Sequence, residues 1–514
     1  MTQVSPKALA GGPQPLTGGM LWVAALMLAA ANFIAVLNMT IANVAVPGIA
    51  GGLGAAASQG TWVITSYAVG EAVTVPLTGW LAARFGSVRV FAGSMILFGV
   101  FSIVCGLSNS LGLLVVARVF QGLCGGPLMP LSQTLLMRIF PKEKAGAAIG
   151  IWSVTTLVAP VVGPILGGWL VDDYAWNWVF LINAPIAIGF GLYAWRLLKR
   201  YQEAPVRNPF DLVGLILLVI WVAALQLVLD EGKNLDWFAS SQIVTLSIVA
   251  ALGFAVFLIW ELHEKHPVVD LRVFRHRGFN AAVLTITVAF AAFFGASVLT
   301  PLWLQSFMNY TATDAGLATA WTGVTALFVA PMVASSKRDP RLLVFFGVLW
   351  MGLVTLWRTV ANTDMAFWDI AIPLAVMGLG LPFFFIPTTG IALGSVEEHE
   401  MDSAAGLMNF LRTLSGAAAT SIVTTVWASQ TTRNHAELVG MIDPDRAART
   451  AMEQGGMTPG AIDQALDYLL TIQSGMLSTN QVMTGIAVMF IVAAGIVWLA
   501  PKPTRTIEPG AGGH

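Results

Sequence analysis

The sequence has few charged residues and few cysteines, and each shortage excludes a class of protein. Only 10% of its 514 residues are charged, whereas soluble globular domains carry about 25%. The formal net charge is -1, which gives no electrostatic basis for binding nucleic acid. Cys105 and Cys124 lie in apolar runs and offer neither a disulfide framework nor metal-ligand spacing. We expect both to be packing residues.

Two further absences restrict the energy source and the cofactors. No loop of the Gly-Lys-Ser/Thr type occurs, and no long polar segment is present that would form a nucleotide-binding domain. This argues against an ATP-driven pump. None of the six histidines falls inside an apolar run, so we expect no haem, no metal relay and no other cofactor.

Long apolar runs dominate the sequence instead. A helix needs about 20 apolar residues to cross a bilayer, and we count fourteen such runs, none of which alternates polar and apolar residues as a membrane strand would. They lie near 21–46, 61–82, 90–108, 111–136, 145–170, 179–198, 212–229, 242–261, 279–306, 315–335, 342–361, 367–393, 403–428 and 480–500. The first run is too long for the core of a signal peptide, so we interpret it as a retained span. The sequence predicts an all-α membrane protein with fourteen transmembrane helices.

The distribution of basic residues orients these spans. Nineteen of the 26 lysines and arginines fall in loops on the N-terminal side, five fall on the opposite side, and Arg118 and Arg412 lie inside spans. Loops rich in Lys and Arg stay in the cytoplasm, and an even number of spans puts both ends of the chain on one side. We therefore expect both termini to be cytoplasmic.

Two connections between the runs are notable. The cytoplasmic segment 262–278, "LHEKHPVVDLRVFRHRG", is a natural hinge between two halves. On the outer side, 429–479 is the only long loop, and its pieces "HAELVGMIDPDRAARTAMEQGG" and "TPGAIDQALDYLLTIQSGM" predict short amphipathic helices. Thr458 is the expected N-cap of the second helix, with Pro459 in its first turn.

An ordered series of motifs identifies a family resemblance. The series runs "GWLAARFGSVRV" at 79–90, "RVFQGLCGG" at 118–126, "APVVGPILGGWL" at 159–170 and "WNWVFLINAP" at 176–185. In this order and spacing the motifs resemble the major facilitator superfamily, and most closely its fourteen-helix drug/proton antiporters of the EmrB type. "TIANVAVPGIAG", "LDEGKNLDWF" and "NFLRTLSGAAATSI" match that type almost letter for letter. The resemblance covers about residues 20 to 500.

The resemblance implies a fold and a function. It implies two six-helix bundles facing one another around a central cavity, with one helix pair inserted between them. The expected parts are a cytoplasmic tail 1–20, an N-terminal bundle 21–200, the inserted pair 211–262, a cytoplasmic linker 263–278, a C-terminal bundle 279–500 with the periplasmic loop 429–479, and a tail 501–514. It also implies an exporter of hydrophobic drugs and other toxic compounds that is driven by protons and is not an enzyme. Such a protein lies in the inner membrane and works with a periplasmic adaptor protein and an outer-membrane channel.

One polar position departs from the family pattern. EmrB-type proteins usually carry an aspartate where this chain has Asn38, and an amide neither takes up nor releases a proton. Glu71 is the only acidic residue deep in a span of the first half. Arg118 also lies inside a span, where a cation costs at least ~2.5–3.5 kcal/mol, and in the superfamily this arginine sits near the proton site. We hypothesise that the coupling carboxylate has moved to Glu71; the alternative is a protonated, silent Glu71 that hydrogen-bonds neighbouring helices.

A glycine-rich face in the fifth span resembles the antiporter signature of the family. Gly163, Pro164, Gly167 and Gly168 bend the helix and remove side-chain bulk along one face. In the family this face packs against the other bundle and seals a leak path. The alternative is generic helix packing.

The loop after the second span resembles the gating loop of the superfamily. It contains Gly79, Arg84, Gly86 and Arg89, but the acidic residue that usually follows the first glycine by four positions is Ala83 here. Arg84 and Arg89 either contact the ends of neighbouring helices or act only as positive-inside residues.

The substrate cavity is expected to be apolar and aromatic, as suits lipophilic compounds. In such a chain most single aromatics face lipid or pack helices, so each is an individual hypothesis. Arg412 either anchors the polar end of a substrate or caps helix carbonyls. The candidates are Asn38, Met39, Trp62, Gln121, Trp152, Phe293, Phe294, Trp303, Gln305, Trp321, Phe384, Asn409 and Arg412.

Three alternative interpretations remain at this point. An importer or uniporter of a small metabolite would share the fold. A membrane-embedded acyl- or glycosyltransferase would need clustered nucleophiles at one membrane face, and the sequence has none. The 429–479 loop is either part of the docking site for the adaptor or a lid or tolerated insertion.

Overall fold

The computed structural model describes residues 16, 18–55, 57–60, 62–141, 144–202, 211–442, 452–455 and 457–502, and within these ranges every regular element is a helix. Helices satisfy all backbone hydrogen bonds within one segment, which an apolar environment requires. From the ranges described, most of the predicted tails 1–20 and 501–514 is missing, and so are 203–210 and the tip of the 429–479 loop.

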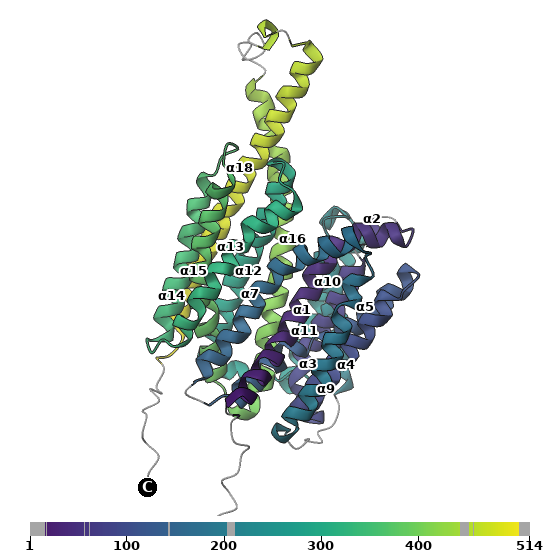
Figure 1. Ribbon diagram of the computed structural model, residues 1–514, viewed down its shortest axis with the longest axis vertical. Coiled ribbons are helices and arrows are strands. Elements are labelled where there is room, and N and C mark those ends of the chain that lie inside the picture. Colours follow the sequence, from purple (N-terminus) through teal and green to yellow (C-terminus); the bar gives the residue numbers. More distant parts are fainter. Residues whose placement is uncertain are drawn as a thin grey trace, which may run out of the picture. The chain divides into compact units, whose positions relative to one another are not determined.

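The helices of the first half follow the predicted runs closely (Figure 1). They are α1 (Gly18–Gly52), α2 (Ala57–Gly60), α3 (Trp62–Phe85), α4 (Ser87–Gly106), α5 (Leu111–Gly125), α6 (Leu128–Ile139), α7 (Ala145–Asp173), α8 (Trp178–Leu181), α9 (Asn183–Leu198), η3 (Lys199–Tyr201), α10 (Leu212–Glu231), η4 (Trp237–Ala239) and α11 (Ser241–His263).

The second half continues in the same way. Its helices are η5 (Leu271–Arg275), α12 (Arg277–Phe307), α13 (Ala312–Ala334), α14 (Pro340–Trp357), η6 (Arg358–Val360), α15 (Phe367–Gly394), η7 (Glu398–Glu400), α16 (Met401–Ile442), α18 (Pro459–Ile496) and η8 (Val497–Leu499).

Among the described residues, eleven helices are long and apolar enough to cross a membrane, which makes the chain a multi-pass membrane protein. The other three predicted runs coincide with α3, α7 and α16, which form helices but are not among the eleven. Polar residues explain part of the difference, because α3 contains Glu71 and α16 contains Asn409 and Arg412. Hydropathy alone therefore leaves the count of fourteen unconfirmed.

One predicted run is interrupted. The run 111–136 divides into α5 and α6 at Gly125, Gly126 and Pro127. Proline lacks the N–H that an α-helix needs and clashes with the preceding turn, so it breaks or kinks the helix. Gly126 and Pro127 keep right-handed helical dihedrals, and α5 and α6 together form one apolar crossing.

The prediction of short separate helices in the 429–479 loop is wrong. The helix α16 runs for 42 residues to Ile442, and α18 begins at Pro459 and runs for 38 residues, so both spans extend without a break into the loop. Figure 1 shows these extensions side by side, projecting beyond the ends of α12 to α15. We call the segments 429–442 and 459–475 the outer hairpin. Thr458 is the N-cap and Pro459 opens the first turn, as predicted, although the Thr458 side chain makes no capping hydrogen bond.

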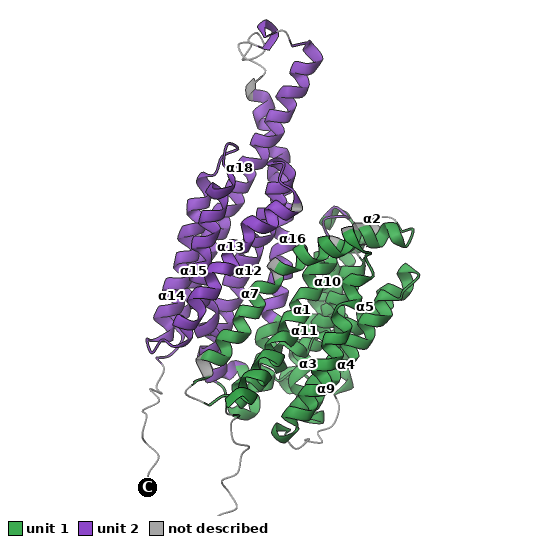
Figure 2. Ribbon diagram, in the orientation of Figure 1, with its two compact units in different colours: residues 1–230, 237–273, 396–410 green, residues 231–236, 274–395, 411–514 purple. Residues whose placement is uncertain are grey.

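The chain divides into two compact units, coloured separately in Figure 2. Unit 1 comprises residues 1–230, 237–273 and 396–410, and unit 2 comprises 231–236, 274–395 and 411–514. In unit 1, α1 packs on α7, α3 on α5 and α4 on α9. In unit 2, α15 packs on α13 and α14, and α18 packs on α12 and α14. The helix pair α10 and α11 groups with unit 1.

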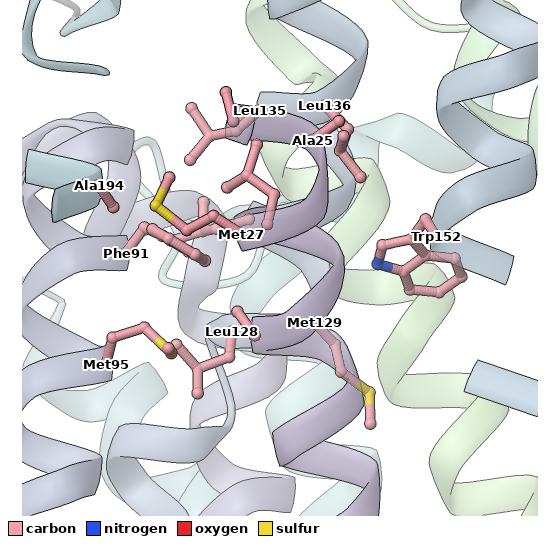
Figure 3. Packing of buried hydrophobic residues seen from close by; sticks show 14 of the residues in the cluster. Ala25, Met27, Phe91, Met95, Leu128, Met129, Leu135, Leu136, Trp152 and Ala194 are labelled. Atoms are coloured by element: carbon pink, nitrogen blue, oxygen red, sulfur yellow. The ribbon is translucent and has the colours of Figure 1, made fainter. Parts of the chain in front are cut away.

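A large apolar cluster lies in unit 1 and fixes α1, α4, α6, α7 and α9 against one another (Figure 3). Phe91, Met95, Leu128 and Leu135 are fully buried in it. Such packing holds the helix backbones in fixed positions, so the polar side chains on these helices are also held in place.

Candidate functional site

The first site in unit 1 is centred on Arg118 of α5, which is completely buried. Its Nε donates to the carbonyl of Val63 at 2.8 Å, and its Nη1 donates to Oε1 of Gln121 at 2.7 Å. The guanidinium carbon also lies 4.3 Å from the ring centroid of Tyr67 and 5.4 Å from that of Phe180, close enough for cation–π attraction. Among the described residues Nη2 has no hydrogen-bond acceptor, so the guanidinium has a donor left for another group.

Glu71 of α3 belongs to the same neighbourhood. Its side chain is 1% exposed, and its backbone lies against Gly122 of α5, one turn after Arg118. Burial disfavours the charged carboxylate, whereas the nearby guanidinium favours it. The two residues that the sequence singled out for proton coupling are therefore brought together in unit 1.

Gln121 joins Asn38 to this arrangement. Its Nε2 donates to the hydroxyl of Ser102 at 2.7 Å and to Oδ1 of Asn38 at 3.5 Å. Its Oε1 accepts hydrogen bonds from the Cys105 thiol and from the Arg118 guanidinium. Asn38, Gln121 and Ser102 are fully buried. One amide thus connects the position of the usual family aspartate on α1 to the arginine on α5.

Glycines bring α3 and α5 close enough to form the site. A Cβ on Gly122 would collide with the carbonyl of Tyr67 and lie 2.9 Å from the backbone nitrogen of Glu71. A Cβ on Gly70 would likewise collide with the carbonyl of Val119. Only glycine permits this approach, because the obstructing atoms are backbone atoms that cannot rotate away.

The arrangement can hold a proton in the apolar interior. It contains one carboxyl group, one guanidinium that stabilises the ionised form, and neutral amides and hydroxyls that donate and accept hydrogen bonds. No sequence pattern marks Tyr67, Ser102 or Cys105 as members of this site, because only the packing shows which face of each helix points inward.

The antiporter motif packs α7 against α1. A Cβ on Gly163 would collide with the hydroxyl of Thr40, and one on Gly167 would lie 3.0 Å from the Ile41 carbonyl. Gly168 has nothing within 4 Å of its Cβ position, and the Pro164 side chain lies outside the described residues. Within unit 1, two of the three glycines therefore serve close helix packing; sealing of a leak path stays a prediction.

The predicted gating loop is a sharp turn between α3 and α4. Gly86 has φ 90°, a backbone conformation that glycine adopts at low cost. The side chain of Gln202 closes over the turn, accepting from the Arg89 backbone N–H and donating to the Phe85 carbonyl. The Arg89 guanidinium lies over the Trp195 ring at 5.9 Å, while Arg84 ends α3 and is half-buried.

A cluster that sequence reasoning missed lies next to this turn. Asp402, in the first turn of α16, accepts from Ser87 at 2.8 Å and from Arg138 at 3.0 Å, and Arg138 also donates to Ser87. Gly79 lies against the same turn, because a Cβ there would collide with Ser403. In this loop Ala83 stands where the resemblance predicts an acidic residue, and Asp402 supplies a carboxylate nearby. The partners are 264 residues apart in sequence, so no local pattern announces them.

The candidate cavity residues of unit 1 occupy different environments. Asn409 is fully buried and donates to Oε1 of Gln133 at 3.0 Å. Trp152 is fully buried in the apolar cluster and donates to Ser132, so it packs helices in this structure. Met39 is partly buried against that cluster, and Trp62 is 42% exposed. Contact of any of them with substrate stays a prediction.

In unit 2 several of the candidates meet in one aromatic cluster around Phe290. Phe294 stacks on Phe290 at 5.4 Å, Phe293 and Phe385 contact it at wider angles, and Phe384 contacts Phe385. The buried Arg412 guanidinium lies 5.5 Å from the Phe290 ring.

The other candidates of unit 2 lie apart from this cluster. Trp321 contacts Trp368 on α15. Gln305 is exposed and bonds its own helix through the Pro301 carbonyl. Trp303 is buried and lines a separate cavity.

Comparison with known proteins agrees with the motif series. The family model for the Major Facilitator Superfamily matches residues 28–420. The chain is 42% identical over 499 residues to the Multidrug export protein EmrB of Haemophilus influenzae, covering 96% of this chain and 98% of that protein. It is 42% identical over 506 residues to the Fatty acid resistance protein FarB of Neisseria gonorrhoeae, covering 97% and 99%.

A solved structure supports the fold. The proton:xylose symporter XylE superposes with a TM-score of 0.59 at 11% identity, covering 94% of this chain and 96% of that one. At this identity the likeness concerns the fold alone.

Proposed function

Because the chain belongs to the major facilitator superfamily and is a multidrug efflux transporter of the EmrB type, we propose that Glu71 carries the proton that drives its export cycle. The compounds exported are hydrophobic, and the names of the relatives suggest drugs and fatty acids among them. Protons move inward as each compound moves outward.

The observation that carries the proposal is that a buried carboxyl group and a buried guanidinium lie on two closely packed helices of unit 1, α3 and α5. Glu71 is 1% exposed on α3, which packs closely on the helix of Arg118, while position 38 holds a neutral amide that reaches Arg118 through Gln121. A single Glu71 proton therefore changes the net charge of this interior cluster by one. Since the energy of a charge in a low-dielectric interior depends strongly on its partners, protonation biases the conformation that the transporter prefers.

The test is drug export driven by an imposed pH gradient in everted vesicles. We expect Glu71→Gln to export at the background rate, because the amide cannot exchange a proton. Glu71→Asp keeps a carboxyl group and is the matched control, with partial activity expected. We expect Asn38→Asp to restore part of the export that Glu71→Gln loses, because it places a carboxyl group on the same network. Gradient-dependent export at the wild-type rate by Glu71→Gln would refute the proposal.

The larger architecture follows the family. We propose fourteen spans, with α3, α7 and α16 crossing the membrane beside the eleven more apolar helices, and both termini in the cytoplasm. In the order of the chain, the inserted pair 211–262 falls between the bundles 21–200 and 279–500. The membrane is the inner membrane, and aromatic residues of unit 2, among them Phe293, Phe294 and Phe384, line the route of the substrate.

We also propose that the outer hairpin docks a periplasmic adaptor protein, which hands substrate to an outer-membrane channel. The hairpin has internal order to support this role. At its base, Asn434 on α16 donates to Ser478 and Gln481 on α18, and within the hairpin Ile462, Leu466 and Leu470 are buried. Deletion of 440–470 should abolish drug resistance in cells and spare export in vesicles. Loss of both activities would show instead that the hairpin is needed for folding or turnover.

A metabolite importer or uniporter is the competing function. No described contact favours it, and the vesicle assay separates the two, since an importer would move its substrate in the direction opposite to that of the drug.

A further inference from the structure

A further arginine of unit 2, Arg358, is half-buried and takes no part in the proposed proton site. It follows α14, whose other end adjoins the basic segment with Lys337 and Arg338. Arg358 therefore lies at the C-terminal end of α14. The distribution of basic residues predicts that this end is on the outer side of the membrane. Asn480 of α18 donates to the carbonyl of Ala361 close by, so this region is at the base of the outer hairpin.

The head group of Arg358 points into the bundle. Its Nη2 donates to the hydroxyl of Thr300, and its Nη1 lies 3.9 Å from the sulfur of Met377. Thr300 and Met377 are 1% and 2% exposed. No carboxylate among the described residues forms an ion pair with Arg358, and a thioether is a weak acceptor. This half-buried positive charge therefore has no ion-pair partner among the described residues, and it remains available to an anion.

A cavity of about 40 Å³ opens beside this guanidinium. Its polar lining comes from Arg358, Trp303 and Thr479. Asp369, which is exposed in the first turn of α15, also lines it. Trp303 is 4% exposed, and its indole N–H has no acceptor among the described residues. Two donors, the half-buried guanidinium and the buried indole N–H, therefore line one small space that otherwise has mostly apolar walls, including Ile370, Pro373 and Met483.

The size and the donors favour one chemical group. A water needs about 10–15 Å³ of such volume, so the cavity has room for about three heavy atoms, the number in a carboxylate group. A carboxylate also accepts several hydrogen bonds at once and pairs strongly with a guanidinium. A phosphate group has five heavy atoms and fits the space less well.

We propose that Arg358 and Trp303 form a binding site for the carboxylate of a straight-chain amphiphile at the outer end of unit 2. The apolar residues Ile370, Pro373 and Met483 accommodate the beginning of its chain. This extends the proposed function, on which it rests for the direction of transport, by naming an anionic substrate class and its exit site. Binding itself does not depend on proton coupling.

The experiment measures equilibrium binding of labelled dodecanoate to the purified full chain in nanodiscs of a zwitterionic lipid. Dodecanol and dodecyltrimethylammonium, of equal chain length, serve as neutral and cationic probes. We expect Arg358→Gln to weaken dodecanoate binding about tenfold or more, as loss of a charge-assisted hydrogen bond predicts, and to change the affinity for dodecanol little. Arg358→Lys should retain part of the selectivity for the acid, and Lys233→Gln, which removes an exposed charge from another loop of unit 2, should leave it at the wild-type value.

Trp303→Phe provides a second, milder variant in case Arg358→Gln does not fold. It removes the indole donor, keeps an aromatic side chain and should weaken dodecanoate binding without weakening dodecanol binding. Equal affinity of wild type and both variants for dodecanoate would overturn the proposal. So would loss of dodecanoate binding in discs that contain phosphatidylglycerol, because that result would assign the site to a lipid phosphate.

The two proposals fail separately. Selective dodecanoate binding without gradient-driven export would contradict proton coupling and leave this site intact. Gradient-driven export of cationic dyes without selective dodecanoate binding would contradict this site and leave proton coupling intact.

Discussion

Unit 1 contains two clusters built around arginine, and their partners differ in kind. In the middle of α5, Arg118 is held by a backbone carbonyl, an amide and an aromatic ring. At the end of α6, Arg138 forms a direct ion pair with Asp402 at 3.0 Å, reinforced by Ser87. Both guanidiniums are largely buried, so burial alone does not explain the choice of partners.

The difference corresponds to two tasks. An ion pair with full hydrogen bonding stabilises one geometry strongly, and breaking it leaves an uncompensated charge. A guanidinium held by neutral groups keeps its positive charge available to a group whose own charge changes. We infer that the Arg138 cluster holds helices together and that the Arg118 cluster responds to protonation of Glu71.

The largest expected effect comes from removing the charge of the responsive cluster. In Arg118→Gln, Glu71 loses the cation that stabilises its ionised form, so we expect gradient-driven export in everted vesicles to fall to background. Arg118→Lys keeps the charge, but an ammonium lacks the planar fork that reaches Val63 and Gln121 together, and an intermediate rate is expected. Wild-type export by Arg118→Gln, in protein that folds normally, would contradict the inference that the Arg118 cluster responds to protonation of Glu71.

A smaller effect is expected from the holding cluster. Asp402→Asn keeps the shape and one acceptor but removes the negative charge next to Arg138, and we expect about 1–3 kcal/mol of lost stability. Export should slow, yet it should still vanish when an ionophore collapses the gradient. The control is Glu437→Gln, which breaks the exposed pair with Arg433 and should change the melting temperature very little. Export that no longer depends on the gradient in Asp402→Asn would assign coupling to this cluster as well.

Much of the fold can be predicted from the sequence, because apolar run length and helix formation in a membrane have the same cause. The apolar runs became helices, and the family motifs indicated the superfamily. The errors occur where tertiary contacts decide. The outer ends of α16 and α18 stabilise each other through Asn434 and Ser478, so they continue as long helices where local patterns predicted short ones.

The candidate site was predicted in part. Glu71 and Arg118 stood out because a charge in an apolar run is conspicuous in any sequence. Asp402 was not noticed, since a carboxylate at a helix start has an ordinary role there and its partner Arg138 lies far away in the chain. Arg358 was assigned to an outer loop by its position. Its inward direction depends on contacts with Thr300 and Met377 that only the packed helices define.

The smallest expected effect concerns an arginine at the end of a helix in unit 2, and it tests whether direct carboxylate pairing is typical of helix ends. Asp339 caps α14, accepting from the backbone N–H of Arg341, and pairs with the Arg341 guanidinium at 2.8 Å. That hydrogen bond lowers the pKa of Asp339 below its ordinary value. The ionised carboxylate therefore adds stability above the pKa of the unfolded chain, and this stability is lost as the pH falls through the lower pKa of the folded state. Asp339→Asn keeps a capping oxygen and lacks the charge, so we expect a loss of about 0.5–1 kcal/mol at neutral pH. The gap between the melting temperatures of the two proteins should close in strong acid, and a gap that persists there would mean that Asp339 acts through its shape rather than its charge.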